Sequence, residues 1–252
     1  MMSSVGIPAI ILMCLCFGAL LGMALRAALP KDHLSQDSAD VIKLATGLMA
    51  TLAALVLSLL ISSANNDHNV VESEYRRDLA IVIVLDRYLD AYGPEAQEPR
   101  DLFRHALIWR CQRTWPQEDF GPKESSNEVP IGAVFQQLLR LSPRGDRQTW
   151  LHAQALQLAG SLAQARWLLI IEKVGNPLPR PFLIVLTSWT TLIFLSFGLF
   201  ARLNTTVIVA LFAAALAVSG AIFLIMELNS PFRGLMQISS APAHVALAAI
   251  SR

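Results

Sequence analysis

Charged residues are scarce in this sequence of 252 amino acids. Only 15% of the residues are Asp, Glu, Lys or Arg, whereas an average globular domain has about 25%. A net charge of +1, with no run of Lys and Arg interleaved with aromatic residues, gives no basis for nucleic acid as a partner. The lack of charge, together with a hydrophobic content of 54%, instead indicates a membrane protein.

Cysteine is also rare. Three cysteines cannot build a disulfide framework. Cys14 and Cys16 lie two residues apart in an apolar run, on different faces of a predicted helix, and Cys111 is alone in a polar region. We interpret all three as small apolar packing residues, with a redox or metal role as the alternative.

Motifs that carry chemistry are absent. The sequence has no phosphate-binding loop, nucleophile elbow or zinc-protease spacing. The five histidines are scattered. His68 and Glu72 stand four residues apart on a predicted helix, and His33 and Asp37 have the same spacing in the first loop. Two ligands are too few for a metal site, so a solvated surface explains either pair more simply. The sequence therefore predicts no enzyme, no cofactor and no metal site.

Long apolar runs are what the sequence does contain. A helix needs about 20 apolar residues to cross the hydrocarbon core of a bilayer. Four windows without any charge reach that length: Ile7–Leu25, Leu44–Ala64, Phe182–Ala201 and Thr206–Met226. The alternative for the first window is a cleaved secretory signal, but the window lacks a basic start and exceeds the usual apolar region of about 7–15 residues. We therefore predict an all-α membrane protein with four transmembrane helices.

The windows divide the chain into three parts. Residues 1–64 hold the first two transmembrane helices and a short loop, residues 65–181 form a polar helical insert, and residues 182–252 hold the last two transmembrane helices and a tail. Four crossings place the insert and both termini on one side. The distribution of Lys and Arg near the membrane favours the cytoplasm for that side, and the lone Cys111 is compatible with a reducing compartment.

The insert shows three helical stretches. No glycine or proline occurs from Leu48 to Tyr92, so the second transmembrane helix is expected to continue into the insert and to stop at Gly93-Pro94. A second helix is predicted over Arg100–Trp115, and a third begins near Ser142-Pro143 or Asp146. Apolar residues of the third helix alternate at spacings of four and three, as in a coiled-coil seam: Leu151, Ala155, Leu158, Leu162, Ala165 and Leu169. This seam needs a partner helix, either the extended second helix or one from another subunit.

The second transmembrane helix carries a mildly polar stripe. Thr51, Ser58 and Ser62 fall near one line along the helix and lead to Asn65 at its polar end. A water-filled path needs such a lining, because hydroxyl groups without a partner face lipid poorly. The alternative is that each hydroxyl bonds the preceding turn of its own helix.

The first transmembrane helix contains Gly18 and Gly22, a pair of small residues four apart. Such a pair lets a neighbouring helix backbone approach closely, although it is also common in the general packing of apolar helices.

The stretch "MELNSPFRGLMQIS" follows the last apolar window. Glu227 stands where hydrocarbon gives way to headgroups, so its carboxylate is expected to reach water at little cost. Asn229 is a plausible helix-ending residue, and Pro231 stops the helix and turns the chain along the membrane surface.

The same stretch resembles the closing signature of the bestrophin-like domain family, a domain of unknown function in bacterial and plastid membrane proteins. That signature has an acid, then Leu-Asp-Arg-Pro-Phe-small-Gly, then a short apolar, strand-like tail. Asn229 and Ser230 replace the usual aspartate and arginine, which removes a possible ion pair. Five residues match the signature: Glu227, Leu228, Pro231, Phe232 and Gly234.

The resemblance implies a subunit laid out like those of the bestrophins, ring-forming anion channels whose second helix lines the pore. It further implies that the protein lies in a bacterial inner membrane, that four or more identical subunits form a ring, and that inorganic ions pass through it. Bestrophins have a run of acids after Asn-Pro-Phe-Gly that binds calcium. Here "NSPFRG" leads into "LMQISSAPAHV", which has no acid, so we predict no calcium gating of that kind.

Two functions remain open from the sequence. The leading hypothesis is a homo-oligomeric ion channel lined by the second helix, and the resemblance implies anions as the permeant ions. The alternative is a non-conducting membrane adaptor that binds a partner protein through the seam of the insert.

Overall fold

The computed structural model describes residues 6–29, 36–121, 131–175, 180–201, 204–232 and 234–250, without the side chains of 36–38, 131, 169–175 and 180. Helices are the only regular elements in these ranges, which confirms the all-α prediction. They are α1 (Gly6–Ala28), α2 (Gln36–Tyr92), the short 3-10 helix η2 (Pro94–Ala96), α3 (Gln97–Thr114), α4 (Ile131–Arg140), α5 (Asp146–Gly175), α6 (Arg180–Phe200), α7 (Thr205–Leu228) and α8 (Ala241–Ile250).

The chain forms two compact units. The first contains Met1–Asn69 and Pro177–Met236, and the second contains Val70–Asn176 and Gln237–Arg252. The boundaries of the three parts predicted from the sequence were set by the apolar windows, not by contacts between residues. That division of the chain stays a prediction.

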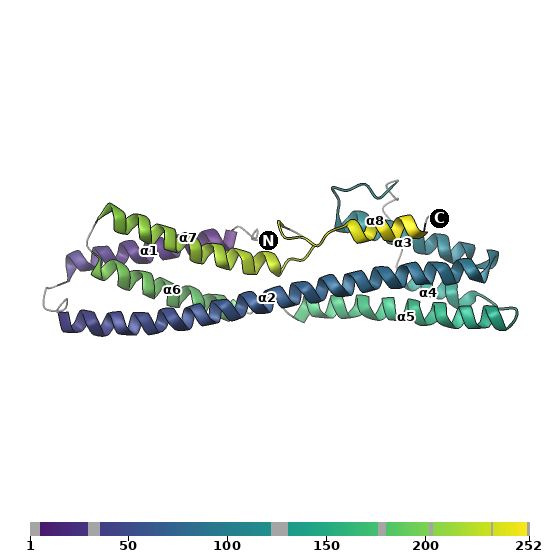
Figure 1. Cartoon of the computed structure of the whole chain (residues 1–252), viewed down its shortest axis with the longest axis horizontal. Coiled ribbons are helices and arrows are strands. Elements are labelled where there is room, and N and C mark those ends of the chain that lie inside the picture. Colours follow the sequence, from purple (N-terminus) through teal and green to yellow (C-terminus); the bar gives the residue numbers. More distant parts are fainter. Residues whose placement is uncertain are drawn as a thin grey trace. The chain divides into compact units, whose positions relative to one another are not determined.

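Among the residues that the structure describes, four helices are long and apolar enough to cross a membrane, and they correspond to the four predicted windows: α1, α2, α6 and α7. In the first unit they share one apolar core, in which Leu15, Leu186 and Ile222 are fully or almost fully buried. Ala53 of α2 joins the same core. Figure 1 shows α1, α6 and α7 running beside the first part of α2. The prediction of four transmembrane helices is confirmed.

The backbones of α1 and α6 touch at glycines. A Cβ atom on Gly22 would lie 2.1 Å from the carbonyl oxygen of Leu195, and one on Gly198 would lie 2.1 Å from the carbonyl oxygen of Ala19. Neither helix could come this close with a larger residue at these positions. Gly18 lies on the same face of α1, where an added Cβ would meet Thr191 at 2.9 Å. The structure thus places the predicted glycine pair against α6 of the same chain.

The long second helix is confirmed, because α2 is continuous from Gln36 to Tyr92. It stops where the sequence indicated. Gly93 has a φ of +119°, a backbone conformation that residues other than glycine rarely adopt. Pro94 follows at the start of η2. This turn sends the chain back along α2 into α3.

The second unit gathers α3, α4, α5 and α8 around the remainder of α2. The start of α5 at Asp146 agrees with the sequence. The side-chain amide of Gln148 donates to the carbonyl oxygen of Tyr92 at 3.0 Å, and the rings of Tyr88 and Trp150 lie 5.7 Å apart. These contacts place the beginning of α5 against the end of α2, as Figure 1 shows.

Helix α4 was not predicted from the sequence. Its signal was the four-residue spacing of Val134 and Leu138, both of which are buried. The carbonyl oxygen of Leu138 lies 2.7 Å from Nε2 of His152 on α5, so α4 and α5 are packed together.

The end of the chain, for which the sequence predicted only a tail, contains a helix, because residues 241–250 form α8. The carbonyl oxygen of Ser240 accepts hydrogen bonds from the backbone amides of Ala243 and His244, which starts the helix. Ala243, Ala246 and Ile250 are buried at helical spacing. The alternation that a half-buried strand would need is absent, and packing against α3 selects the helix.

Candidate functional site

Within the first unit, α2 is the transmembrane helix that its own chain covers least. Only 11% of the most apolar window of α2 is buried within the chain. The corresponding windows are 39% buried in α1, 33% in α6 and 22% in α7. The buried side of this part of α2 is marked by Ala53 and Ala64. Most of the remaining surface of the helix must therefore be covered by something other than the chain itself.

The predicted polar stripe lies on this uncovered side. Thr51, Ser58, Ser62 and Asn65 are all exposed in the chain. At 3.6 residues per turn, these four positions fall within about 60° around the helix axis, roughly opposite Ala53. The structure thus brings the four sequence-predicted residues onto one face of α2.

Not every hydroxyl of α2 points away from the chain. The Thr51 hydroxyl donates to the carbonyl oxygen of Gly47 at 2.9 Å, so it is satisfied by its own helix. Thr46 is buried, and its hydroxyl lies 2.8 Å from that of Ser196 on α6. The pair of Thr46 and Ser196 ties α2 to the core, which keeps the face of Ser58 and Ser62 turned outward.

The end of α7 holds a buried carboxylate. Glu227 is 2% exposed, so the expectation that it reaches water is wrong. Its Oε2 accepts a hydrogen bond from the backbone amide of Leu235 at 2.7 Å. The chain that turns back after the helix supplies this donor, which offsets the cost of burying the acid.

Gly234 makes room for that carboxylate. A Cβ atom at this position would lie 2.0 Å from Oε2 of Glu227, and the φ of +97° also favours glycine. Asn229 caps the helix, since its side-chain amide donates to the carbonyl oxygen of Ile225 at 2.8 Å. Leu228 is buried, while Pro231 and Phe232 are partly buried in the turn. We call the described residues 227–232, 234 and 235 the signature turn.

The signature turn borders α2. Nδ1 of His68 lies 3.4 Å from the carbonyl oxygen of Leu228. Glu72, which the sequence analysis considered with His68, instead pairs with Arg76 at 2.6 Å. Among the described residues, no three His, Cys, Asp or Glu side chains gather where they could hold a metal ion.

The seam of α5 is largely covered by its own unit. Leu151, Ala155 and Leu162 are buried, whereas Leu158 and Ala165 are partly buried. The side chain of Leu169 lies outside the described side chains. A partner protein would find little of this seam accessible on the folded chain.

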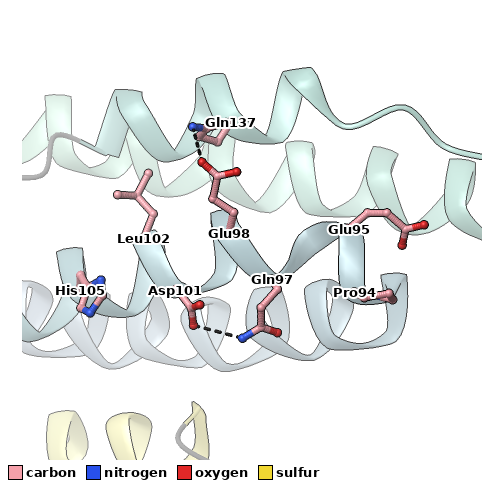
Figure 2. A pocket seen from close by; sticks show the side chains of 8 residues that line it. All are labelled: Pro94, Glu95, Gln97, Glu98, Asp101, Leu102, His105 and Gln137. Carbon is pink, nitrogen blue, oxygen red and sulfur yellow. Dashed lines mark hydrogen bonds between the residues drawn. The ribbon is translucent and has the colours of Figure 1, made fainter.

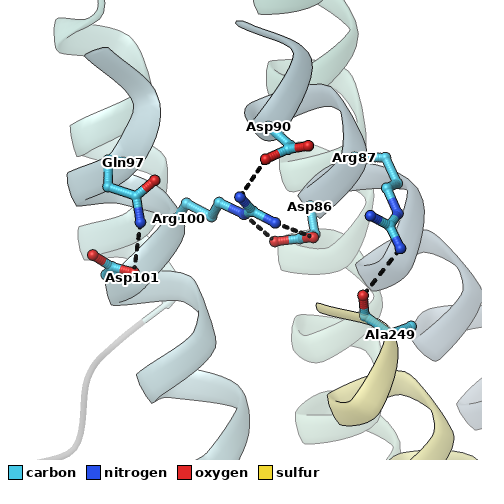
Figure 3. A network of polar contacts seen from close by, with 7 residues as sticks. All are labelled: Asp86, Arg87, Asp90, Gln97, Arg100, Asp101 and Ala249. Carbon is cyan, nitrogen blue, oxygen red and sulfur yellow. Dashed lines mark hydrogen bonds and ion pairs between the residues drawn. The ribbon is translucent and has the colours of Figure 1, made fainter. Parts of the chain in front are cut away.

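An ion-pair network joins α2 and α3 in the second unit. Nε and Nη2 of Arg100 donate to the two oxygens of Asp86 at 2.7 and 3.0 Å, and Nη1 donates to Asp90 (Figure 3). Asp86 is 2% exposed, so the guanidinium compensates a buried charge. These hydrogen bonds to Asp86 are the main reason why the pKa of Arg100 is raised. The network was missed because Asp86 and Arg100 are separated by a turn whose geometry the sequence does not give.

A second polar contact holds α8 to the loop after α3. Glu118 accepts hydrogen bonds from Ser240 at 2.7 Å and from His244 at 3.0 Å. The ring of Phe120 stacks on His244 with centroids 4.3 Å apart. The indole of Trp115 donates to the carbonyl oxygen of Ile238 at 3.2 Å. This set of contacts attaches the segment before and within α8 to the second unit.

A surface groove lies where η2, α3 and α4 meet. Its lining includes the carboxylates of Glu95, Glu98 and Asp101 (Figure 2). Glu98 accepts a hydrogen bond from Gln137 and Asp101 accepts one from Gln97, both at 3.2 Å. Glu98 and Asp101 are therefore engaged with neighbouring amides.

Cys111 is buried on α3, and burial raises the pKa of its thiol to about 11. A thiol with so high a pKa forms very little thiolate at neutral pH. This agrees with the interpretation of Cys111 as a packing residue.

Comparison with known proteins gives a family match. A model of the family described as Bestrophin-like domain matches residues 13–243, which is most of the chain. The matched range begins in α1 and ends in α8, so it includes the polar stripe and the signature turn. No curated protein matches the chain, and no solved structure matches it.

Proposed function

The chain belongs to the bestrophin-like domain family, and from this premise we propose that it assembles with copies of itself into an ion-conducting membrane protein lined by α2. Bestrophin-like proteins are a membrane family and not an enzyme family. The four transmembrane helices make this chain a membrane protein. That the protein conducts ions, which ion it conducts and how many subunits it has belong to the proposal.

The uncovered face of α2 is the observation that carries the proposal. Ser58, Ser62 and Asn65 are exposed on a helix of which only 11% of the apolar window is buried. A serine or asparagine in contact with lipid lacks strong hydrogen-bond partners beyond its own helix. Facing the same side chains of other subunits, or water, provides such partners.

A single chain has too few transmembrane helices to enclose an aqueous path. In the proposed assembly, each subunit contributes α2 to the centre, and α1, α6 and α7 separate it from lipid. Four or more subunits would be needed, as the layout of ring-forming channels implies. Mass determination of the detergent-solubilised protein by light scattering tests this step, and a monomer or dimer would contradict it.

The proposed location is the bacterial inner membrane, with the insert and both termini in the cytoplasm. The excess of Arg and Lys beside the insert supports this orientation. Labelling of single cysteines placed in the insert, in intact cells and in lysed cells, tests the orientation directly.

Replacement of Ser58 by leucine tests the lining. The variant should reduce ion flux into liposomes, because a bulky apolar side chain would narrow and dry the path. Ser188 on α6 provides the matched control, since it is also an exposed serine of a transmembrane helix and donates to the carbonyl oxygen of Val185 within its own helix. Ser188→Leu should conduct like the unaltered protein. Equal flux through Ser58→Leu and the unaltered protein would count against this lining.

The adaptor function is less well supported. It relied on an accessible seam, and Leu151, Ala155 and Leu162 are buried within the chain.

A further inference from the structure

The outer face of α5 changes character near its end. Upstream, the exposed positions include Gln157, Ser161 and Gln164, all of which are polar. At Trp167 and Leu168 the exposed residues become apolar, with 64% and 49% of their surfaces uncovered. The sequence continues with three more apolar residues, Leu-Ile-Ile, before the next charge at Glu172.

Trp167 and Leu168 are neighbours on the helix, where successive residues point about 100° apart, so together they form an apolar patch on the exposed side of α5. An exposed apolar patch often marks a surface that contacts a membrane or another protein. The core of the second unit does not cover Trp167 and Leu168. This end of α5 therefore offers an apolar surface that the core of its own unit leaves free.

We propose that the end of α5, at Trp167 and Leu168, contacts the lipid bilayer at the level of the headgroups. The transmembrane helix α6 begins at Arg180, only 12 residues after Leu168, so the chain itself keeps this end of α5 close to the membrane. Tryptophan is enriched at membrane interfaces because its ring is apolar and its N–H is polar. Lys173 and Arg180 follow in the sequence and suit anionic headgroups.

Helix α2, which runs from the membrane into the insert, shows a comparable transition. The exposed residues of α2 include Leu52, Leu55 and Leu59 beside the polar stripe, and from Asn65 to Asn69 all of them are polar. An interface between hydrocarbon and water explains such a change along a helix. In α5 the order is reversed, as expected for a helix that runs towards the membrane.

Trp150 provides an internal control. It lies on the same helix 17 residues earlier and is 56% exposed, but its ring packs against Tyr88 and its neighbours include Asp146 and Arg147. A tryptophan that is exposed only because it lies on the surface should behave like Trp150, whereas one at the bilayer should not.

The experiment uses the full-length protein in nanodiscs of phosphatidylcholine and phosphatidylglycerol. After Cys14, Cys16 and Cys111 are replaced by alanine, Trp167→Cys and Trp150→Cys are each spin-labelled. Collision rates with oxygen, which dissolves in hydrocarbon, and with a nickel chelate, which stays in water, are then compared. Gel filtration and circular dichroism check that both labelled proteins are folded.

The proposal expects the ratio of oxygen to nickel collisions to be several-fold higher at position 167 than at position 150. Equal ratios at the two positions would overturn it, because Trp167 would then face water. Low collision rates with both reagents, with spectral broadening between labels, would also overturn it, because a second copy of the chain would then cover the surface.

Discussion

The carboxylate of Glu227 occupies the space that a side chain at residue 234 would need, since a Cβ atom on Gly234 would lie 2.0 Å from Oε2. The two residues are joined through the backbone as well, because the amide of Leu235 donates to the same oxygen. The acid and the glycine of the signature therefore form one structural feature. Pro231 and Phe232, between them, belong to the turn that brings the chain back to the end of α7.

Replacement of Gly234 by alanine should destabilise the first unit. The added methyl group would displace the buried carboxylate, and a residue with a side chain would be strained at a φ of +97°. We expect a loss of about 1–3 kcal/mol, seen as a lower melting temperature of the detergent-solubilised protein. Gly220→Ala on α7 is the matched control, because nothing lies within 4 Å of its Cβ position. Equal melting temperatures of the two variants would contradict the close packing of Glu227.

Replacement of Glu227 should separate the role of its charge from that of its hydrogen bond. Glu227→Gln retains an oxygen that can accept from the amide of Leu235, whereas Glu227→Ala leaves this amide without its acceptor. We expect Glu227→Ala to lose about 1–3 kcal/mol and Glu227→Gln to lose less, measured by the same thermal assay. If the glutamine variant were the less stable of the two, the charge itself would be the important property.

Replacement of Gly22 should disturb the contact between α1 and α6. An added Cβ would approach the carbonyl oxygen of Leu195 to 2.1 Å, so one backbone would have to move. Gly22→Ala is expected to cost about 1–3 kcal/mol and to lower the melting temperature. Gly47→Ala on α2 meets nothing within 4 Å and should leave it unchanged or raise it slightly. An unchanged melting temperature in Gly22→Ala would show that the helices are farther apart.

Replacement of Arg100 should strongly destabilise the second unit. Arg100→Met would leave the carboxylate of Asp86 buried without its partner, at a cost of about 3–5 kcal/mol. Protease resistance of the insert provides the measurement. The double variant Arg100→Met, Asp86→Leu removes both charges and should recover much of the resistance. A double variant as sensitive as the single one would indicate that Arg100 acts mainly through packing.

Acid should loosen α8. Hydrogen bonds from Ser240 and then from His244 lower the pKa of Glu118 below its ordinary value of 4.5. A group whose pKa is lowered by folding stabilises the folded state above its unfolded pKa, and this contribution is lost as the pH falls through the folded pKa. A spin label at Val245→Cys, an exposed position on α8, should therefore be immobile at neutral pH and become mobile in acid. With Glu118→Ala the label should already be more mobile at neutral pH, and an unchanged spectrum would contradict this attachment of α8.

Local patterns in the sequence were sufficient to predict the transmembrane helices and several helix boundaries in the insert. Four charge-free windows, the stretch without glycine or proline up to Tyr92, and the helix start at Asp146 all correspond to observed helices. They could be predicted because hydrocarbon length and helix-breaking residues act within a few turns of the chain. The short helices α4 and α8 were not predicted, since each has only a few apolar residues at helical spacing; they pack against α5 and α3.

The candidate site was only partly accessible from the sequence. Spacing alone placed Thr51, Ser58, Ser62 and Asn65 on one stripe, because helical periodicity is a local property. That this stripe lies away from the core of the chain follows from Ala53 and its packing against the other transmembrane helices. The burial of Glu227 was not predictable, because it requires an amide donor that lies eight residues further along the chain.

The sequence by itself determined that this is an all-α membrane protein with four crossings, because the cost of placing charge in hydrocarbon is set by composition and length. Only the tertiary structure decided which faces are covered: α6 against the glycines of α1, the backbone after α7 around Glu227, and Arg100 against Asp86. These contacts join residues that are distant in the chain. Their free energies depend on distances and burial that arise only when the helices are packed together.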